Sequence, residues 1–167
     1  MTRSRIGGFG LLELLTVTTI VAVLASIAVV SWVDTVRRIR VDSAITRFTT
    51  SLWHARSEAI RRGAWLVVER LDDCPTRNWS CGWLTYEDLN NNALLDKEDK
   101  VIQTTEAWPE VQIRVNANGL RQRIRLAPNG TSHAVSAGSF FFEHIDSKAC
   151  SRLLFSSGLR WRREGCA

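Results

Sequence analysis

A run of 20 residues without a charged side chain, Leu14–Val33, constrains this chain more than any other feature of its sequence. At a rise of about 1.5 Å per residue, a helix of that length is roughly 30 Å long, which is the thickness of the hydrocarbon core of a bilayer. Arg3 and Arg5 precede the run, and positive charge before a span holds that end in the cytoplasm. The sequence therefore predicts one membrane-spanning helix, with the bulk of the chain on the outer side.

A cleaved secretory signal is the alternative, but its apolar region is usually about 7–15 residues long. The run here is longer, and it continues without a glycine or proline break into a second helical pattern. Apolar residues recur there at steps of three or four: Val41, Ala44, Ile45, Phe48, Leu52, Ala55 and Ala59. Gly63 follows two arginines and is a suitable helix stop. We expect one helix from about Phe9 to Arg62, apolar all round in its first half and amphipathic in its second.

Beyond Gly63 the apolar spacing changes to a period of two, which is typical of β-strands. Eight short stretches carry this pattern: residues 64–70, 81–87, 100–106, 111–115, 121–127, 139–145, 151–157 and 159–164. Asn118-Gly119 and Pro128-Asn129-Gly130 provide turn signals between them. The prediction is an α+β fold, in which a long N-terminal helix packs on an antiparallel β-sheet or a small β-sandwich.

Four cysteines are present, and an even number in an exported domain suggests two disulfides. Three connectivities are possible. We favour Cys74–Cys81 with Cys150–Cys166, because these pairs close the shortest loops. A zinc site is the alternative, but six residues between the first two cysteines is poor spacing for zinc and no histidine lies nearby.

The charge is distributed unevenly along the chain. Residues 69–110 carry a net charge of −6, whereas residues 111–167 carry nine basic and three acidic side chains, a net charge of +6. Alternation along the strands places Arg121, Arg123 and Arg125 on one shared face and Arg160 and Arg162 on another, and it separates Arg114 from its apolar neighbours. Arg163, next to Arg162, is a further candidate for DNA binding. If the strands are neighbours, they form one arginine-studded face that could follow a phosphate backbone. A plain solvated face and pairing with an acidic neighbouring subunit are the alternatives, and Trp161 is expected in the core rather than as a base-stacking platform.

A carboxylate, Glu13, stands at the front of the apolar run. An ionised carboxylate inside a membrane costs several kcal/mol unless it is paired, although it could also lie at the interface. A partner cation would have to come from another chain or from a new amino terminus.

The stretch "GGFGLLELLTVTTIVAVLASIA" resembles the class III signal of type IV pilins and type II secretion pseudopilins. In that family a prepilin peptidase cuts after the glycine that precedes the aromatic residue, and it methylates the new terminus. The resemblance implies cleavage between Gly8 and Phe9, N-methylation of Phe9, and pairing of Glu13 with the terminal amine of a neighbouring subunit. Loss of Arg3 and Arg5 leaves a mature formal charge of +3.

The resemblance also implies the organisation of the chain. A leader occupies residues 1–8, and a transmembrane and filament-core helix occupies residues 9–35. A periplasmic pilin domain occupies residues 36–167, with an amphipathic helix (36–62) and a β domain (64–167). The subunit would lie in the bacterial inner membrane and then in a pilus or pseudopilus.

The final "SSGLRWRREGC" and "LAPNGTS" resemble the GspH/FimT group of minor pilins and pseudopilins. Some members of the FimT branch bind DNA for natural transformation through a C-terminal Gly-Arg-x-Arg motif. In this chain Gly158-Leu159-Arg160-Trp161-Arg162 shifts the arginines by one position. The resemblance implies a minor pilin that binds double-stranded DNA. The alternative is a purely structural subunit, which primes a pilus or serves type II secretion.

Enzymatic and metal-binding functions find little support in the sequence. The three histidines, His54, His133 and His144, are scattered, and no nucleophile is placed convincingly with them. Five side chains fall at calcium-loop spacing: Asp88, Asn90, Asn92, Asp96 and Asp99. The glycine that such a loop requires is Ala93, so we favour an Asx-rich turn between two strands. We expect no cofactor, no metal and no catalytic site.

Overall fold

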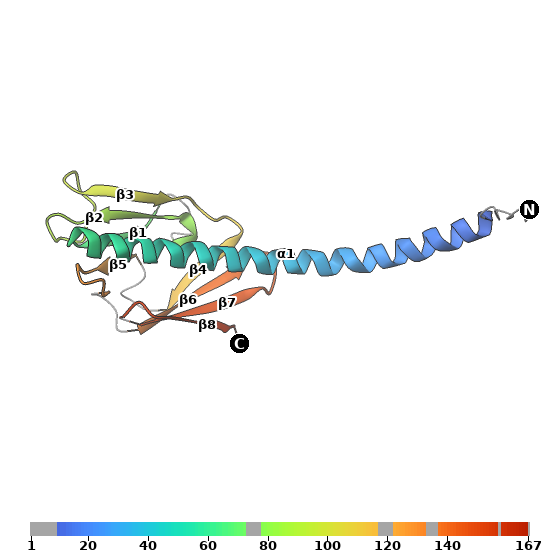
Figure 1. Ribbon diagram of the computed structural model, residues 1–167. Helices are drawn as coiled ribbons and strands as arrows, with labels where there is room; N and C mark the ends of the chain where they lie inside the picture. The colour runs from blue at the N-terminus through green and yellow to red at the C-terminus, as the bar shows by residue number, and fades with distance from the viewer. Residues whose placement is uncertain (1–9, 73–77, 117–121, 133–136, 157, 167) are drawn as a thin grey trace, which may run out of the picture. The chain divides into compact units, whose positions relative to one another are not determined.

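The computed structural model describes residues 10–72, 78–116, 122–132, 137–156 and 158–166, without the side chains of residues 27–31 and 137. Figure 1 shows a long helix followed by short strands. The elements are α1 (Leu11–Arg62), β1 (Leu66–Arg70), η1 (Trp79–Cys81), β2 (Trp83–Glu87), β3 (Lys100–Thr105), β4 (Val111–Asn116), β5 (Arg123–Leu126), β6 (Ala137–His144), β7 (Cys150–Ser156) and β8 (Trp161–Gly165). Each predicted strand is found, with its ends at most two residues from the predicted ones.

The predicted continuous helix is confirmed as α1. It ends at Gly63, whose φ of +63° lies in the left-handed region that glycine adopts without strain. The N–H of Ala64 donates to the carbonyl of Ala59 at 3.2 Å and closes the last turn. The transmembrane character predicted for residues 9–35 is not confirmed: within the described residues, no helix is both long enough and apolar enough to cross a membrane.

The chain divides into two compact units, one that ends at Val36 and one that begins at Arg37. In the first unit, the described apolar side chains of α1 are open to solvent, and Leu11 and Leu12 are 84% and 80% exposed. Such an uncovered apolar surface is typical of a segment that is buried against a partner.

The second unit contains its own hydrophobic core. The predicted apolar stripe of α1 is buried there, from Val41 to Ala59, and it packs against residues of both sheets. Phe48 lies at the centre and is fully buried. Its ring centroid is 5.3 Å from that of Trp83 in β2 and 4.7 Å from that of Phe140 in β6. One aromatic side chain of the helix therefore joins the two sheets.

The strands form two antiparallel sheets of four strands each. The order in the first is β3-β2-β1-β5, and the order in the second is β4-β6-β7-β8. The α+β prediction is confirmed, with two antiparallel sheets and the second half of α1 packed on the strands (Figure 1). The two sheets are built alike, each from three strands that are consecutive in the sequence and a fourth that is not: β5 pairs with β1 in the first sheet, and β4 pairs with β6 in the second.

The predicted turn at Pro128-Asn129-Gly130 is present, and it joins β5 to the short bridge between Leu126 and Ser132. The N–H of Gly130 donates to the carbonyl of Ala127 at 2.8 Å. The predicted Asn118-Gly119 turn lies outside the described residues.

A disulfide links Cys150, at the start of β7, to Cys166, just after β8, as predicted. The two Cα atoms are 5.7 Å apart. Cys81 is also disulfide-bonded, and its predicted partner, Cys74, lies outside the described residues. The bond between Cys150 and Cys166 fastens the last strand to its neighbour.

Candidate nucleic-acid interface

The arginines predicted to share one face lie on two different sheets. Arg123 and Arg125 belong to β5, at an edge of the first sheet, whereas Arg114 and Arg162 lie on β4 and β8, at opposite edges of the second. The condition that these strands be neighbours is therefore not met, and no single face carries all of them. Sequence alternation gives the face of a strand but not its sheet, which explains the error. Arg121 lies outside the described residues.

The two β5 arginines are held by acidic side chains. Nη2 of Arg125 lies 2.9 Å from Oδ2 of Asp88, whose side chain is fully buried, and the guanidinium covers the ring of Trp65 with 4.4 Å to its centroid. Nη2 of Arg123 lies 2.9 Å from Oε1 of Glu69. Removing either partner would leave a charge poorly compensated. These arginines therefore stabilise the first sheet and its β2–β3 loop.

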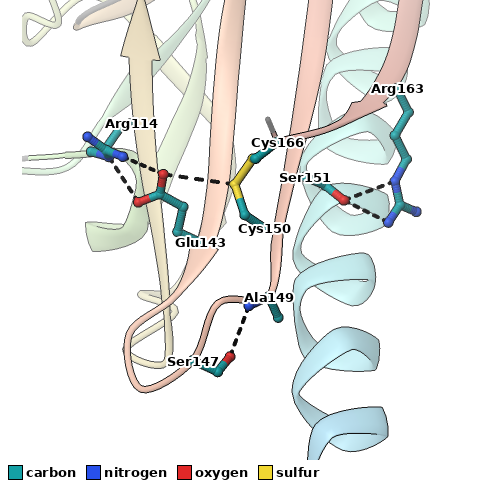
Figure 2. Close-up of a disulfide and its surroundings, with 8 residues drawn as sticks. All are labelled: Arg114, Glu143, Ser147, Ala149, Cys150, Ser151, Arg163 and Cys166. Atoms are coloured by element: carbon teal, nitrogen blue, oxygen red, sulfur yellow. Dashed lines mark hydrogen bonds and ion pairs between the residues drawn. A yellow bond between two sulfur atoms is a disulfide. The ribbon is translucent and has the colours of Figure 1, made fainter.

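Arg114 and Arg163 are also engaged within the domain (Figure 2). Nε of Arg114 donates to Oε2 of Glu143 on the neighbouring strand β6, at 3.1 Å. Arg163 donates through Nε and Nη2 to the hydroxyl of Ser151 on β7, at 3.3 and 2.9 Å, and forms an ion pair with Asp42 of α1. Arg163 thus ties β8 to both β7 and the helix.

The turn between β7 and β8 presents its arginines to solvent. Leu159 is buried and Trp161 packs on Phe155, with ring centroids 4.7 Å apart, while Arg160 and Arg162 are exposed. The predicted inward and outward sides are confirmed, and Trp161 is partly buried and packs against the core. The reason differs from the predicted strand alternation, because Leu159 has a φ of +55° and β8 begins only at Trp161. Arg162 forms an ion pair with Glu164, whereas no described acidic side chain pairs with Arg160.

A further arginine, Arg56 of α1, reaches this turn and was missed by the sequence analysis. Its Nη1 donates to the carbonyl of Gly158 at 3.4 Å, across a separation of 102 residues. A Cβ atom added to Gly158 would lie 3.9 Å from Nε of Arg160. Arg56 and Arg160 therefore both approach Gly158, and within the described structure neither has an acidic partner. Nothing in the local pattern of α1 signals this approach, since it depends on tertiary packing.

The last turn of α1 shows the opposite arrangement. Arg61 and Arg62 both donate to Glu58, at 2.6 and 2.7 Å, and Arg62 also reaches Glu87 of β2 at 2.8 Å. These hydrogen bonds lower the pKa of Glu58 from its usual 4.5 to about 2. They also raise the pKa of both guanidinium groups. The cations here are committed to the acids that hold the helix end to the first sheet.

The calcium-like loop between β2 and β3 is an Asx-rich turn, as favoured above. The carboxylate of Asp88 accepts from the N–H groups of Asn92 and Ala93, at 3.1 and 3.0 Å. Asp96 accepts from Asn90 and from the N–H of Glu98, which lowers the pKa of its carboxyl. Within the described ranges, no group of histidine, cysteine and acidic side chains is arranged to hold a metal ion.

Of the residues predicted to act in processing and assembly, only Glu13 is among the described residues. Gly8 and Phe9 lie outside the described residues. Glu13 lies in the first turn of α1, where its N–H donates to the carbonyl of Gly10 at 3.0 Å. None of the described cations pairs with it, so its predicted pairing with a neighbouring amine stays a prediction.

Comparison with known proteins identifies the family. The family model described as "Type II transport protein GspH" matches residues 44–158, more than half of the chain. The chain belongs to this family. It is accordingly a minor pilin or pseudopilin of the GspH/FimT type. No curated protein sequence matches it.

Two crystal structures of the type IV minor pilin FimU from Pseudomonas aeruginosa PAO1 have a similar fold. One matches with a TM-score of 0.57 over 74% of this chain and 91% of FimU, and the other with a TM-score of 0.60 over 76% and 90%. Both are 17% identical to this chain, so they establish the fold alone. The predicted type IV pilin-like fold is confirmed. Membership of the GspH family implies association with other pilin subunits in a pilus or pseudopilus, which is a structural role rather than a catalytic one.

Proposed function

We propose that this GspH-family protein is a minor type IV pilin whose globular domain binds double-stranded DNA, without reading its sequence, during natural transformation. The observation that carries the proposal is the exposed β7–β8 turn, where Arg160 has no acidic partner among the described residues and Arg162 is paired only with its near neighbour Glu164. Cations that the fold does not neutralise are available to phosphate oxygens.

The assembly part of the proposal concerns α1. Cleavage between Gly8 and Phe9 by a prepilin peptidase, N-methylation of Phe9, and a stage in the inner membrane belong to it. The exposed apolar side chains from Leu11 onward support burial of this segment in a filament. In that setting Glu13 takes the terminal amine of a neighbouring subunit as its missing partner.

A structural subunit without DNA binding is the second candidate. It is favoured by the pairing of Arg114, Arg123, Arg125 and Arg163 with acids of the same domain, which leaves few free cations. The description of the matching family model also names a type II transport protein. The two candidates differ in one measurable property, which is saturable binding of duplex DNA.

The test uses the oxidised domain of residues 37–167. Every residue of the core cluster lies between Val41 and Leu159, so this fragment contains the whole core. Fluorescence anisotropy with labelled random-sequence duplex is expected to show saturable binding at low salt. If about three arginines each neutralise one phosphate, the slope of log affinity against log salt is about −3.

The arginine variants give the decisive comparison. Arg160→Gln with Arg162→Gln is expected to weaken binding and to make the salt slope about two units shallower. The matched control is Lys97→Gln with Lys100→Gln, which removes the same charge from exposed side chains at the β2–β3 loop. Absence of saturable binding at low salt, or equal weakening by both variants, would contradict the proposal.

A further inference from the structure

We propose that Trp53 and Arg56 of α1, together with Arg160, form a stacking site for an unpaired nucleobase. This inference rests on the proposed DNA binding and names the preferred form of the DNA: the domain binds single-stranded segments more tightly than closed duplex. The site is built from three segments that are distant in the sequence, namely α1, the turn after β5 and the β7–β8 turn.

Arg56 is fixed between two of these segments. On one side its Nη1 donates to the carbonyl of Gly158 at 3.4 Å. On the other side it lies against Gly130, which has a φ of +77°. A Cβ atom at Gly130 would come within 3.0 Å of Nε of Arg56 and 2.7 Å of Cδ1 of Ile60. The absence of a side chain at Gly130 therefore lets the turn after β5 approach the helix, and Arg56 contacts this turn as well as the β7–β8 turn.

Trp53 supplies an aromatic surface next to this guanidinium. The Cζ atom of Arg56 lies 5.2 Å from the centroid of the Trp53 ring, within the range of a cation–π contact. The indole is nevertheless 50% exposed. It lies off the buried stripe of α1 that includes Phe48, Leu52 and Ala55. The fold of the domain does not require an aromatic side chain at this exposed position.

The charges around the indole favour a polyanion. No acidic partner of Arg56 or Arg160 is found in the described part of the chain, whereas Arg61 and Arg62, less than two turns further along α1, are both paired with Glu58. An aromatic ring beside unneutralised guanidinium groups is the arrangement that binds single-stranded nucleic acid, with the cations on the phosphates and a base on the ring. In a closed duplex the bases remain stacked on each other, so only the phosphate contacts are available.

The experiment compares three probes on the oxidised domain of residues 37–167. They are an oligo(dT) strand of about 20 nucleotides, a duplex of equal length, and an abasic strand that keeps the phosphates but offers no base. We expect oligo(dT) to bind about 5- to 150-fold more tightly than the abasic strand, which is the effect of stacking one base. The duplex should bind with an affinity close to that of the abasic strand.

Variants assign the preference to the indole. Trp53→Ala is expected to bring the affinity for oligo(dT) down to that for the abasic strand, while Trp53→Phe retains most of the preference. The control is Ile39→Ala, which removes another exposed apolar side chain from the same helix and should leave the preference intact. Chemical denaturation of each variant checks that the domain is folded.

The outcomes separate this inference from the proposed function. If none of the probes binds saturably, DNA binding itself is wrong. If the duplex binds but oligo(dT) binds no more tightly than the abasic strand, the stacking site is wrong and DNA binding stands. The same holds if Trp53→Ala still binds oligo(dT) more tightly than the abasic strand. Loss of filament incorporation in Trp53→Ala with an unchanged preference would assign the indole to a neighbouring subunit instead.

Discussion

Replacement of Phe48 by alanine is expected to destabilise the globular domain by about 4 kcal/mol, because this side chain joins the two sheets through the helix. Phenylalanine-to-alanine changes in a core typically cost about 3–5 kcal/mol, which includes the cavity that they leave. Phe48 is fully buried, and it has edge or tilted ring contacts with Trp79, Trp83, Phe140 and Phe142 at centroid distances of 5.5, 5.3, 4.7 and 5.7 Å.

These contacts keep the expected cost above the lower end of that range, since each favourable aromatic pair adds about 0.5–1.5 kcal/mol beyond area burial. A domain of this kind is stable by about 5–15 kcal/mol in total. The loss is therefore large but leaves a folded population to measure. Phe48→Leu, which retains most of the volume but none of the ring contacts, should give an intermediate loss.

The assay is urea denaturation of the oxidised domain of residues 37–167, followed by tryptophan fluorescence and by circular dichroism. If the two probes give coincident transitions and the m-value is unchanged, the free energies of unfolding can be compared directly. Ile39→Ala, at a position that is 56% exposed on the same helix, is the control and should change stability by less than about 0.5 kcal/mol. A loss below about 1.5 kcal/mol for Phe48→Ala would refute the role of this side chain as the junction of the two sheets.

Three further predictions follow from the disulfide, the helix end and the assembly carboxylate. The double change Cys150→Ser and Cys166→Ser should cost about 3 kcal/mol by the chain-entropy model for a separation of 16 residues, measured by urea denaturation, and an unchanged midpoint would contradict it. The pKa of Glu58 is about 2 in the folded domain and 4.5 in the unfolded chain, so its contribution to stability is present above pH 4.5 and is lost as the pH falls toward 2. In Glu58→Gln the free energy of unfolding should therefore fall less steeply with acid. The same acid dependence in the variant and the wild type would count against the pairing. Glu13→Ala should leave the melting curve of the globular unit unchanged but reduce incorporation into filaments, scored by immunoblot of sheared pili, and normal incorporation would remove the pairing argument.

The fold could be predicted from the sequence because its signals are local. The helical stripe from Val41 to Ala59, the stop at Gly63 and the turn at Pro128-Asn129-Gly130 each depend on residues close in the chain, and each is found as expected. The Cys150–Cys166 disulfide follows the same logic, since it closes a short loop. Secondary structure can be predicted from a sequence where residue propensity, hydrophobic period and turn residues all favour the same element.

The candidate site was harder to predict because it depends on which strands pair. Arg123 and Arg160 follow the same alternation rule in the sequence, but β5 pairs with β1 in the first sheet whereas β8 pairs with β7 in the second. No local residue pattern specifies which strand will pair with another that lies far away in the sequence. The approach of Arg56 to Gly158 across 102 residues is a consequence of the same packing.

The positions of the acidic side chains decide which arginines are available to bind a ligand. The net charge of a sequence segment therefore does not locate the binding site. The acidic stretch 69–110 is partly neutralised within the domain, because Glu69 and Asp88 pair with Arg123 and Arg125 of the first sheet. The net charge of +6 on residues 111–167 therefore overstates the cations that are free. Two guanidinium groups without an acidic partner among the described residues, those of Arg56 and Arg160, instead lie near Gly158 in the β7–β8 turn, and one of them, Arg56, belongs to the helix. If DNA binds this domain, replacing Arg56 should weaken the binding more than replacing Arg123, although Arg123 lies in one of the arginine-rich stretches of the sequence.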